Sequence, residues 1–202
     1  MNWFLIPKVL ASPSQQTTYQ GWKAELAAEA RHQCVYCSVH ESAFGGTRNF
    51  HVEHLRPKSR FPHLELVYAN LFYACAVCNS FKLDDWPRDD NNDTSNACYP
   101  DPSVVDFTSL FRVMASSKIV GTCVAARYLE HRLHLNRPQL LVYRRSHRIQ
   151  QRIRAVTTQL EALLAKQLGT RETKRIGGLL AKIVRALVRL NHARPYTASQ
   201  LR

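Results

Sequence analysis

Two cysteine pairs constrain this 202-residue chain more than any other feature of its sequence. The pairs are Cys34/Cys37 and Cys75/Cys78, and 37 residues separate them. Two residues between cysteines let both thiolates reach one tetrahedral ion, so the two pairs together predict a closed four-sulfur zinc site. Such an ion would hold the ends of segment 38–74 together. Because sulfur would fill its four positions, any catalytic metal would have to be a second ion.

Other interpretations of the cysteines have less support. A redox pair is typically solitary and belongs to a βαβ unit, which this sequence lacks; buried thiols without metal are the ordinary alternative. A secreted disulfide scaffold would follow a signal peptide, but residues 1–7 have no basic segment and end at Pro7. No apolar run approaches about 18 residues, so no membrane span is expected, and no membrane is predicted as a partner. We therefore expect a cytoplasmic protein whose paired thiols bind metal.

Hydrophobic periodicity predicts both helices and strands in the first two thirds of the sequence. A helix over 15–33 leads to the first cysteine pair, and a strand over 49–55 precedes a loop over 56–69. Beyond that loop we expect a strand or turn over 71–74, a short helix that begins at Asn79, a loop over 84–106, and a small hairpin over 107–120.

The last third of the sequence has a helical pattern. One helix is expected over about 122–135, and a second begins at Pro138, because proline is favoured in the first turn of a helix. Gly169-Thr170 interrupts the pattern, and a third helix follows. Apolar residues recur every three or four positions in the last two helices, which predicts an antiparallel helix pair.

Segment 51–82 contains the residue types that phosphodiester hydrolysis requires. The reaction needs a base for the attacking water and positive charge at the leaving oxygen. A neutral His54 suits the first task, and the oxygen atoms of Glu53 and Asn79 suit a hard divalent cation. Taken singly, each residue has an ordinary structural interpretation as a buried histidine, a solvated strand residue or a turn or cap residue. Their order and spacing within the double cysteine frame favour the joint interpretation.

The same segment resembles HNH nucleases of the ββα-metal type. That resemblance implies that His54 is the general base, that Asn70 holds the loop that orients it, and that Glu53 and Asn79 bind Mg²⁺ or Mn²⁺. It also implies that Lys82 faces the phosphate backbone. The fold class expected from it is α+β, with a zinc-stabilised ββα-metal HNH core followed by a mainly α-helical, basic C-terminal region.

A narrower resemblance links the chain to the HNH proteins of Septu-type and some retron anti-phage systems. It rests on the run over 51–62, on Asn70-Leu71-Phe72, on Cys75-x-x-Cys78-Asn79-x-x-Lys82 and on the later Leu135-Asn136-Arg137-Pro138. Members of that group work beside an ABC-type ATPase. The resemblance therefore implies an ATPase partner and DNA of phage or host as the target.

The charge of the chain is concentrated at one end. Residues 127–202 hold 17 Lys and Arg against 3 Asp and Glu, whereas residues 1–126 hold 11 against 12. Arg144, Arg148 and Arg152 lie four residues apart on one expected helix face, and Lys182, Arg185 and Arg189 repeat the spacing on the next helix. An ordinary solvated face would normally carry acidic partners, which are nearly missing here, so phosphates or an acidic protein are the better candidates.

Together these observations predict a DNA endonuclease in three parts. The parts are an N-terminal arm and helix over 1–33, the HNH nuclease core over 34–95, and a basic helical region over 96–202. The alternative is a non-catalytic, zinc-containing nucleic-acid-binding or assembly subunit of an ATPase complex. The candidate nucleic-acid contacts are Arg56, Lys58, Lys82, Arg144, Arg148 and Arg152.

Overall fold

The computed structural model describes residues 3–8, 14–89, 92–164 and 170–191. The chain divides into two compact units, Met1–Leu140 and Leu141–Arg202, and each is described by itself. The first unit combines helices with two small antiparallel sheets, and the second is helical. This is the fold class that the sequence predicts. Among the described helices, none is both long and apolar enough to span a lipid bilayer.

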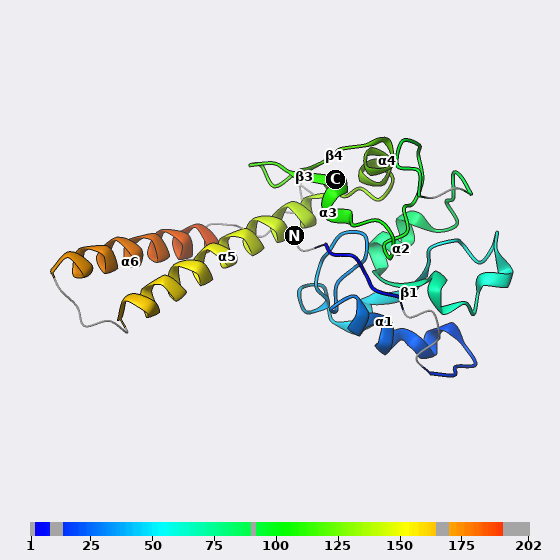
Figure 1. Ribbon diagram of the computed structural model, residues 1–202, viewed down its shortest axis with the longest axis horizontal. Coiled ribbons are helices and arrows are strands. Elements are labelled where there is room, and N and C mark those ends of the chain that lie inside the picture. Colours follow the sequence, from blue (N-terminus) through cyan, green and yellow to red (C-terminus); the bar gives the residue numbers. More distant parts are fainter. Residues whose placement is uncertain (1–2, 9–13, 90–91, 165–169, 192–202) are drawn as a thin grey trace. The chain divides into compact units, whose positions relative to one another are not determined.

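A two-stranded hairpin lies at the centre of the first unit (Figure 1). Strand β1 (Phe50–His54) pairs antiparallel with β2 (Leu71–Cys75), so that Phe50 lies opposite Cys75 and His54 opposite Leu71. Every residue of β2 is buried, as expected for an apolar and aromatic strand covered on both faces. The segment predicted as strand or turn over 71–74 is therefore a strand. The long loop over 56–69 is interrupted by two single turns of 3₁₀-helix, η4 (Pro62–Leu64) and η5 (Tyr68–Asn70).

Helix α2 (Ala76–Lys82) follows β2 without a connecting loop. The prediction that this helix begins at Asn79 is wrong, because it begins three residues earlier. The Sγ atom of Cys75 accepts a hydrogen bond from the backbone N–H of Cys78 and so caps the first turn. The helix ends at Lys82, because the next residue, Leu83, has a φ of 49°, which is incompatible with a further helical turn.

The N-terminal helix is shorter than the 15–33 span predicted from the sequence. A 3₁₀ turn, η1 (Tyr19–Trp22), leads into α1 (Lys23–Glu29). The helix stops because Arg31 and His32 adopt positive φ angles of 49° and 58°. The chain then turns toward the first cysteine pair, and two further 3₁₀ turns, η2 (Glu41–Ala43) and η3 (Thr47–Asn49), lead to β1.

The segment after α2 forms a second small layer of the same unit. Over 84–106 the described residues contain no helix or strand, as predicted. Beyond them come α3 (Phe107–Leu110), the hairpin of β3 (Phe111–Val113) and β4 (Ile119–Gly121), and α4 (Val124–Arg132). Helix α4 packs closely on β4, because a Cβ atom at Gly121 would lie 2.4 Å from the backbone nitrogen of Arg127.

Aromatic side chains dominate the core of the first unit. Phe50 stacks on Tyr73 with ring centroids 4.8 Å apart, and Trp3 stacks on Phe111 at 4.9 Å. Each large apolar side chain buried in this way contributes about 1.5–3 kcal/mol to stability. The largest fully buried side chains include Tyr36, Tyr73, Tyr99, Phe50, Phe72, Phe107, Leu26, Leu71, Ile119, Leu129 and Leu133.

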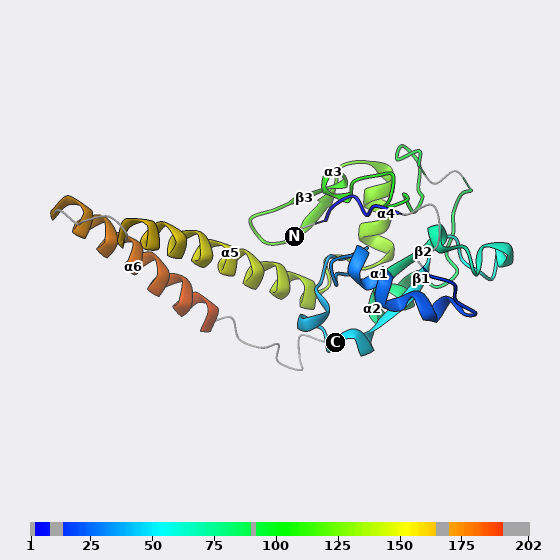
Figure 2. The same ribbon diagram turned by 60° about the horizontal axis from the view of Figure 1, so that its bottom comes forward.

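The described residues of the second unit form two helices. Helix α5 (Pro138–Leu164) begins in the first unit and continues into the second, where α6 (Thr170–Asn191) returns beside it in the opposite direction (Figures 1 and 2). The predicted antiparallel pair is confirmed. The predicted break at Gly169-Thr170 falls where residues 165–169 lie outside the described part of the chain. A groove between the helices is lined by Ile149, Ile153, Val156, Lys182, Ile183 and Ala186.

Candidate active site and metal centre

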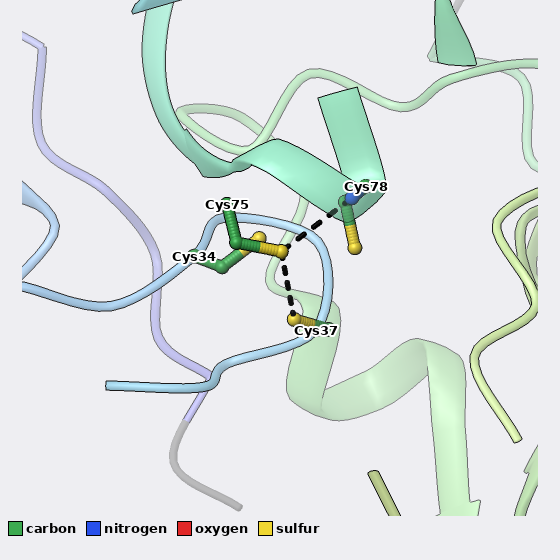
Figure 3. Close-up of side chains that lie close together, drawn as sticks. All are labelled: Cys34, Cys37, Cys75 and Cys78. Carbon is green, nitrogen blue, oxygen red and sulfur yellow. Dashed lines mark hydrogen bonds between the residues drawn. The ribbon is translucent and has the colours of Figure 1, made fainter. Parts of the chain in front are cut away.

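The four paired cysteines converge on one point. Their Sγ atoms all lie within 4.8 Å of one another (Figure 3). Cys75 ends β2 and Cys78 lies in the first turn of α2, while Cys34 and Cys37 come from a tight turn upstream. That turn is held by two backbone hydrogen bonds, from Cys34 to Val39 at 2.9 Å and from Ser38 to Cys34 at 2.8 Å.

The geometry of this cluster fits zinc. Zinc–sulfur bonds of about 2.3 Å in a tetrahedron place sulfur atoms about 3.8 Å apart, and the Sγ atoms of Cys37 and Cys75 are separated by 3.8 Å. All four side chains are buried. Burial, together with the neighbouring thiols, raises the pKa of Cys34 well above its ordinary value, so full ionisation of the cluster requires a cation. The chemistry of the donor set therefore fits a structural zinc ion.

Glu53 and Lys82 form a buried ion pair next to this centre. The Nζ atom of Lys82 lies 2.7 Å from Oε1 of Glu53, and the hydroxyl of Tyr36 donates to the same oxygen at 3.2 Å. The second carboxylate oxygen, Oε2, has no hydrogen-bond or ion-pair partner among the described residues. Burial raises the pKa of Glu53 above its ordinary value, and the charge and hydrogen bonds of Lys82 and Tyr36 oppose that rise.

Two of the predicted nucleic-acid contacts are buried, which contradicts their assignment. Lys82 is 0% exposed, because its ammonium group turns inward to bind Glu53 and the backbone carbonyl of His54. It therefore does not face a phosphate backbone. Arg144 is 4% exposed and does not contribute to an exposed basic face of α5. Helical spacing predicts which residues share a face, but it does not predict which face is covered.

His54 is held by its ring and by its backbone. Its Nε2 atom lies 3.1 Å from the backbone carbonyl oxygen of Glu65, and the Tyr19 ring packs on the imidazole in a T-shaped arrangement with 4.7 Å between centroids. The carbonyl of His54 accepts the hydrogen bond from Lys82. Burial lowers the pKa of His54 below its ordinary value, although the Glu65 carbonyl opposes this. The neutral imidazole is thus favoured near pH 7.

Asn70 closes the loop between β1 and β2. Its Oδ1 atom accepts from the backbone N–H of Arg56 at 2.8 Å, and its Nδ2 atom donates to the carbonyls of Arg56 at 3.0 Å and Leu64 at 3.4 Å. The side chain therefore spans both ends of the loop that also presents the Glu65 carbonyl to His54. This is the kind of loop-holding contact expected for the middle asparagine.

The remaining predicted residues lie in partly or fully exposed positions. Asn79 is half-buried in the middle of α2, on the helix that also carries Lys82. Arg56 is half-buried beside the rings of Phe61 and Trp86, whereas Lys58 is exposed and pairs with Glu65 at 3.0 Å. In the second unit Arg148 is half-exposed and Arg152 is exposed.

A match to known protein families covers this region. Residues 34–84 match the family model for HNH endonuclease. The matched HNH domain contains the four cysteines, Glu53, His54, Asn70 and Asn79, and the match indicates a nuclease. Residues 85–202 lie outside it. No curated protein and no solved structure gives a significant match to the chain.

Several residues around the HNH site were not identified from the sequence. Tyr36 lies within the first cysteine pair, and its hydroxyl reaches Glu53. Tyr19 comes from a 3₁₀ turn far upstream, and no local pattern indicates that it packs on His54. Tyr99, in the predicted loop over 84–106, covers the ammonium of Lys82 with its ring at 5.2 Å. Each contact depends on long-range packing rather than on sequence spacing.

Proposed function

We propose that this protein is a metal-dependent HNH endonuclease that hydrolyses phosphodiester bonds of DNA. The observation that carries the proposal is the hydrogen bond between Nε2 of His54 and the Glu65 carbonyl oxygen. A carbonyl oxygen can only accept, so Nε2 carries the proton and the neutral ring keeps a lone pair on Nδ1. The loop therefore fixes the tautomer in which Nδ1 can act as a base.

In the proposed reaction, Nδ1 of His54 takes a proton from water, and the resulting oxygen nucleophile attacks phosphorus. The bond from phosphorus to the 3′ oxygen then breaks. Glu53, through the Oε2 atom that Lys82 and Tyr36 leave free, and Asn79 would hold a Mg²⁺ or Mn²⁺ ion, which supplies the positive charge that the leaving oxygen needs. The zinc site holds the hairpin and α2 in place and takes no part in the chemistry.

A nicking assay on supercoiled plasmid with Mg²⁺ or Mn²⁺ tests this proposal. His54→Ala should lower the cleavage rate by about 10²–10⁴-fold, the usual contribution of a general base. His63→Ala is the matched control, because His63 is exposed in the same loop region and its ring packs against Phe61. Equal cleavage by wild type and His54→Ala, or no cleavage with either metal, would count against the assignment.

We further propose that the nuclease is the effector of an anti-phage defence system with an ABC-type ATPase partner. The likeness of segments 51–62 and 135–138 to Septu-type and retron-associated nucleases supports this narrower proposal. Co-expression with the product of the neighbouring gene tests it. Stable co-purification and a change in cleavage on ATP addition are expected, whereas an independent, fully active nuclease would contradict the need for a partner.

One observation favours the second candidate, an assembly subunit. On helix α6 the exposed fractions of Leu180, Val184 and Leu187 are 47%, 57% and 48%, and their spacing places them on one helix face. Lys182 and Arg185 are exposed on the same helix. Phosphates would pair with the cations but would leave the apolar side chains in water, whereas a protein surface with apolar and acidic groups would satisfy both.

Two sets of variants separate DNA binding from protein binding in the second unit. Leu180→Ser with Val184→Ser should abolish partner binding and leave plasmid nicking intact if α6 is a protein-binding face. If the exposed cations of α5 contact phosphates, Arg152→Gln should lower the slope of log binding constant against log salt concentration by about one. An unchanged slope would show that Arg152 does not contact a DNA phosphate.

A further inference from the structure

With zinc bound, the four-cysteine centre would carry a net negative charge, because one ion does not neutralise four thiolates. Four thiolates around one Zn²⁺ ion would carry a formal charge of about −2. Cys34, Cys37, Cys75 and Cys78 are all buried, where an uncompensated charge is strongly unfavourable. A cationic side chain or several N–H donors must therefore lie near the sulfur atoms.

Arg137 supplies such donors from a distant part of the chain. Its Nη2 atom lies 3.5 Å from Sγ of Cys78 and 3.9 Å from Sγ of Cys75, within the range of N–H···S hydrogen bonds. Cys75 is the last residue of β2, and Cys78 lies in α2. The guanidinium also lies 5.9 Å from the centroid of the Phe81 ring, and Phe81 belongs to α2, as Cys78 does.

The other side of the same guanidinium binds the end of α4. Its Nη1 atom donates to the backbone carbonyl of Leu133 at 3.1 Å and to that of His134 at 3.4 Å. Helix α4 ends at Arg132, so Leu133 and His134 carry carbonyls that no longer have partners within the helix. A planar guanidinium can serve two sites at once because its five N–H groups form a fixed fork, which the single ammonium of a lysine lacks.

We propose that Arg137 is a positioning residue of the zinc centre, which balances the charge of the Cys75 and Cys78 thiolates and ties α4 to the HNH domain. Arg137 lies outside residues 34–84, so this contact is supplied by the part of the chain that the HNH family match does not include. Zinc retention and the attachment of α4 are then coupled through one side chain. The inference concerns the zinc centre and does not rest on nuclease activity.

Zinc retention in the full-length protein tests this role. Zinc release to a chromogenic chelator and zinc affinity by competition are measured for wild type, Arg137→Met and Arg137→Lys. Loss of a side chain that hydrogen-bonds to a metal ligand typically weakens metal binding by about 10–100-fold. We expect that range for Arg137→Met and a smaller loss for Arg137→Lys, which keeps the charge. Arg127→Met is the matched control, since Arg127 is exposed on α4.

A second measurement separates a role at the zinc centre from a merely structural one. Thermal unfolding is compared for the zinc-loaded and the chelator-treated forms of each variant. The proposal predicts that Arg137→Met lowers the midpoint of the zinc-loaded form more than that of the metal-free form. An equal loss in both forms, or zinc affinity equal to wild type, would overturn it. If Arg137→Met does not yield folded protein, the same comparison is made with Arg137→Lys.

Discussion

The ammonium of Lys82 and the carboxylate of Glu53 form a 2.7 Å ion pair in the interior of the HNH domain. Lys82 is 0% exposed and Glu53 is 3% exposed. The same ammonium donates to the backbone carbonyl of His54 at 2.9 Å. A single side chain of α2 thus holds both of the β1 residues to which catalytic roles are assigned.

Lys82→Met should therefore act on stability rather than on DNA contact. Removing one partner of a buried ion pair leaves the other charge uncompensated and typically lowers the free energy of unfolding by about 3–5 kcal/mol. Denaturant unfolding of the zinc-loaded protein measures this. Lys58→Met is the control, because Lys58 forms an exposed pair with Glu65 whose loss should change stability by about 1 kcal/mol or less.

The double variant Lys82→Met/Glu53→Gln should recover part of the stability lost in Lys82→Met. In the double variant a neutral glutamine amide replaces the Glu53 carboxylate, so no isolated charge is left in the interior. Recovery is measured by the same denaturant titration. If Lys82→Met instead unfolds like wild type and only weakens DNA binding, the buried ion pair is not the role of this lysine.

Asn70→Ala should loosen the loop that fixes the tautomer of His54. The change removes hydrogen bonds to both the N–H and the carbonyl of Arg56, each worth about 0.5–1.5 kcal/mol. Cleavage should fall because the Glu65 carbonyl is no longer held against Nε2. Asn70→Asp keeps the acceptor and loses the donors, so an intermediate cleavage rate is expected in the plasmid assay. Wild-type rates in both variants would contradict a loop-holding role.

Zinc removal should destabilise the HNH domain. The four cysteines join the turn at Cys34 to the end of β2, so without the ion the hairpin loses its closure. Treatment with a strong chelator should weaken the near-ultraviolet circular dichroism of the buried aromatic residues and lower the midpoint of thermal unfolding. Zinc should restore both, whereas magnesium should not. Cys37→Ser should reproduce the effect of the chelator. Persistence of the aromatic signal in the metal-free protein would exclude an essential structural ion.

Asp85 should make stability depend on pH in the acid range. Partial burial by itself raises the pKa of Asp85, but hydrogen bonds from Tyr128, Tyr99 and Arg132 outweigh it and lower the pKa below the ordinary value. The folded protein therefore binds this proton less readily than the unfolded chain. The stabilisation is complete above the unfolded-state pKa of about 3.9 and is lost as the pH falls through the lower folded-state pKa.

Asp85→Asn tests this dependence directly. At pH 7 the variant should be about 1–2 kcal/mol less stable than wild type, and the difference should shrink at pH values below about 4. Denaturant midpoints between pH 7 and pH 3 measure the difference, and acid effects shared by both proteins, such as zinc loss, cancel in it. Asp84→Asn, at the exposed neighbouring position, should show no such trend.

The sequence by itself determined that four cysteines gather at one point and that the HNH match lies around them. The two-residue spacing of each cysteine pair is a local property, because it fixes how two thiolates can meet one ion. The strands at 50–54 and 71–75 and the helix pair of the second unit also follow from local pattern. The loop-holding role of Asn70, which the resemblance implies, stays a prediction. These features need little knowledge of what packs against them.

Only the tertiary structure decided which charged side chains face inward. Lys82 and Arg144 belong to basic patterns in the sequence, yet both are buried, and Arg137 reaches two cysteines about 60 residues away. Periodicity places residues on the same face of an element, but burial depends on the segments that later cover that face. Long-range contacts of this kind arise from packing and charge compensation in the interior, and no local sequence signal encodes them.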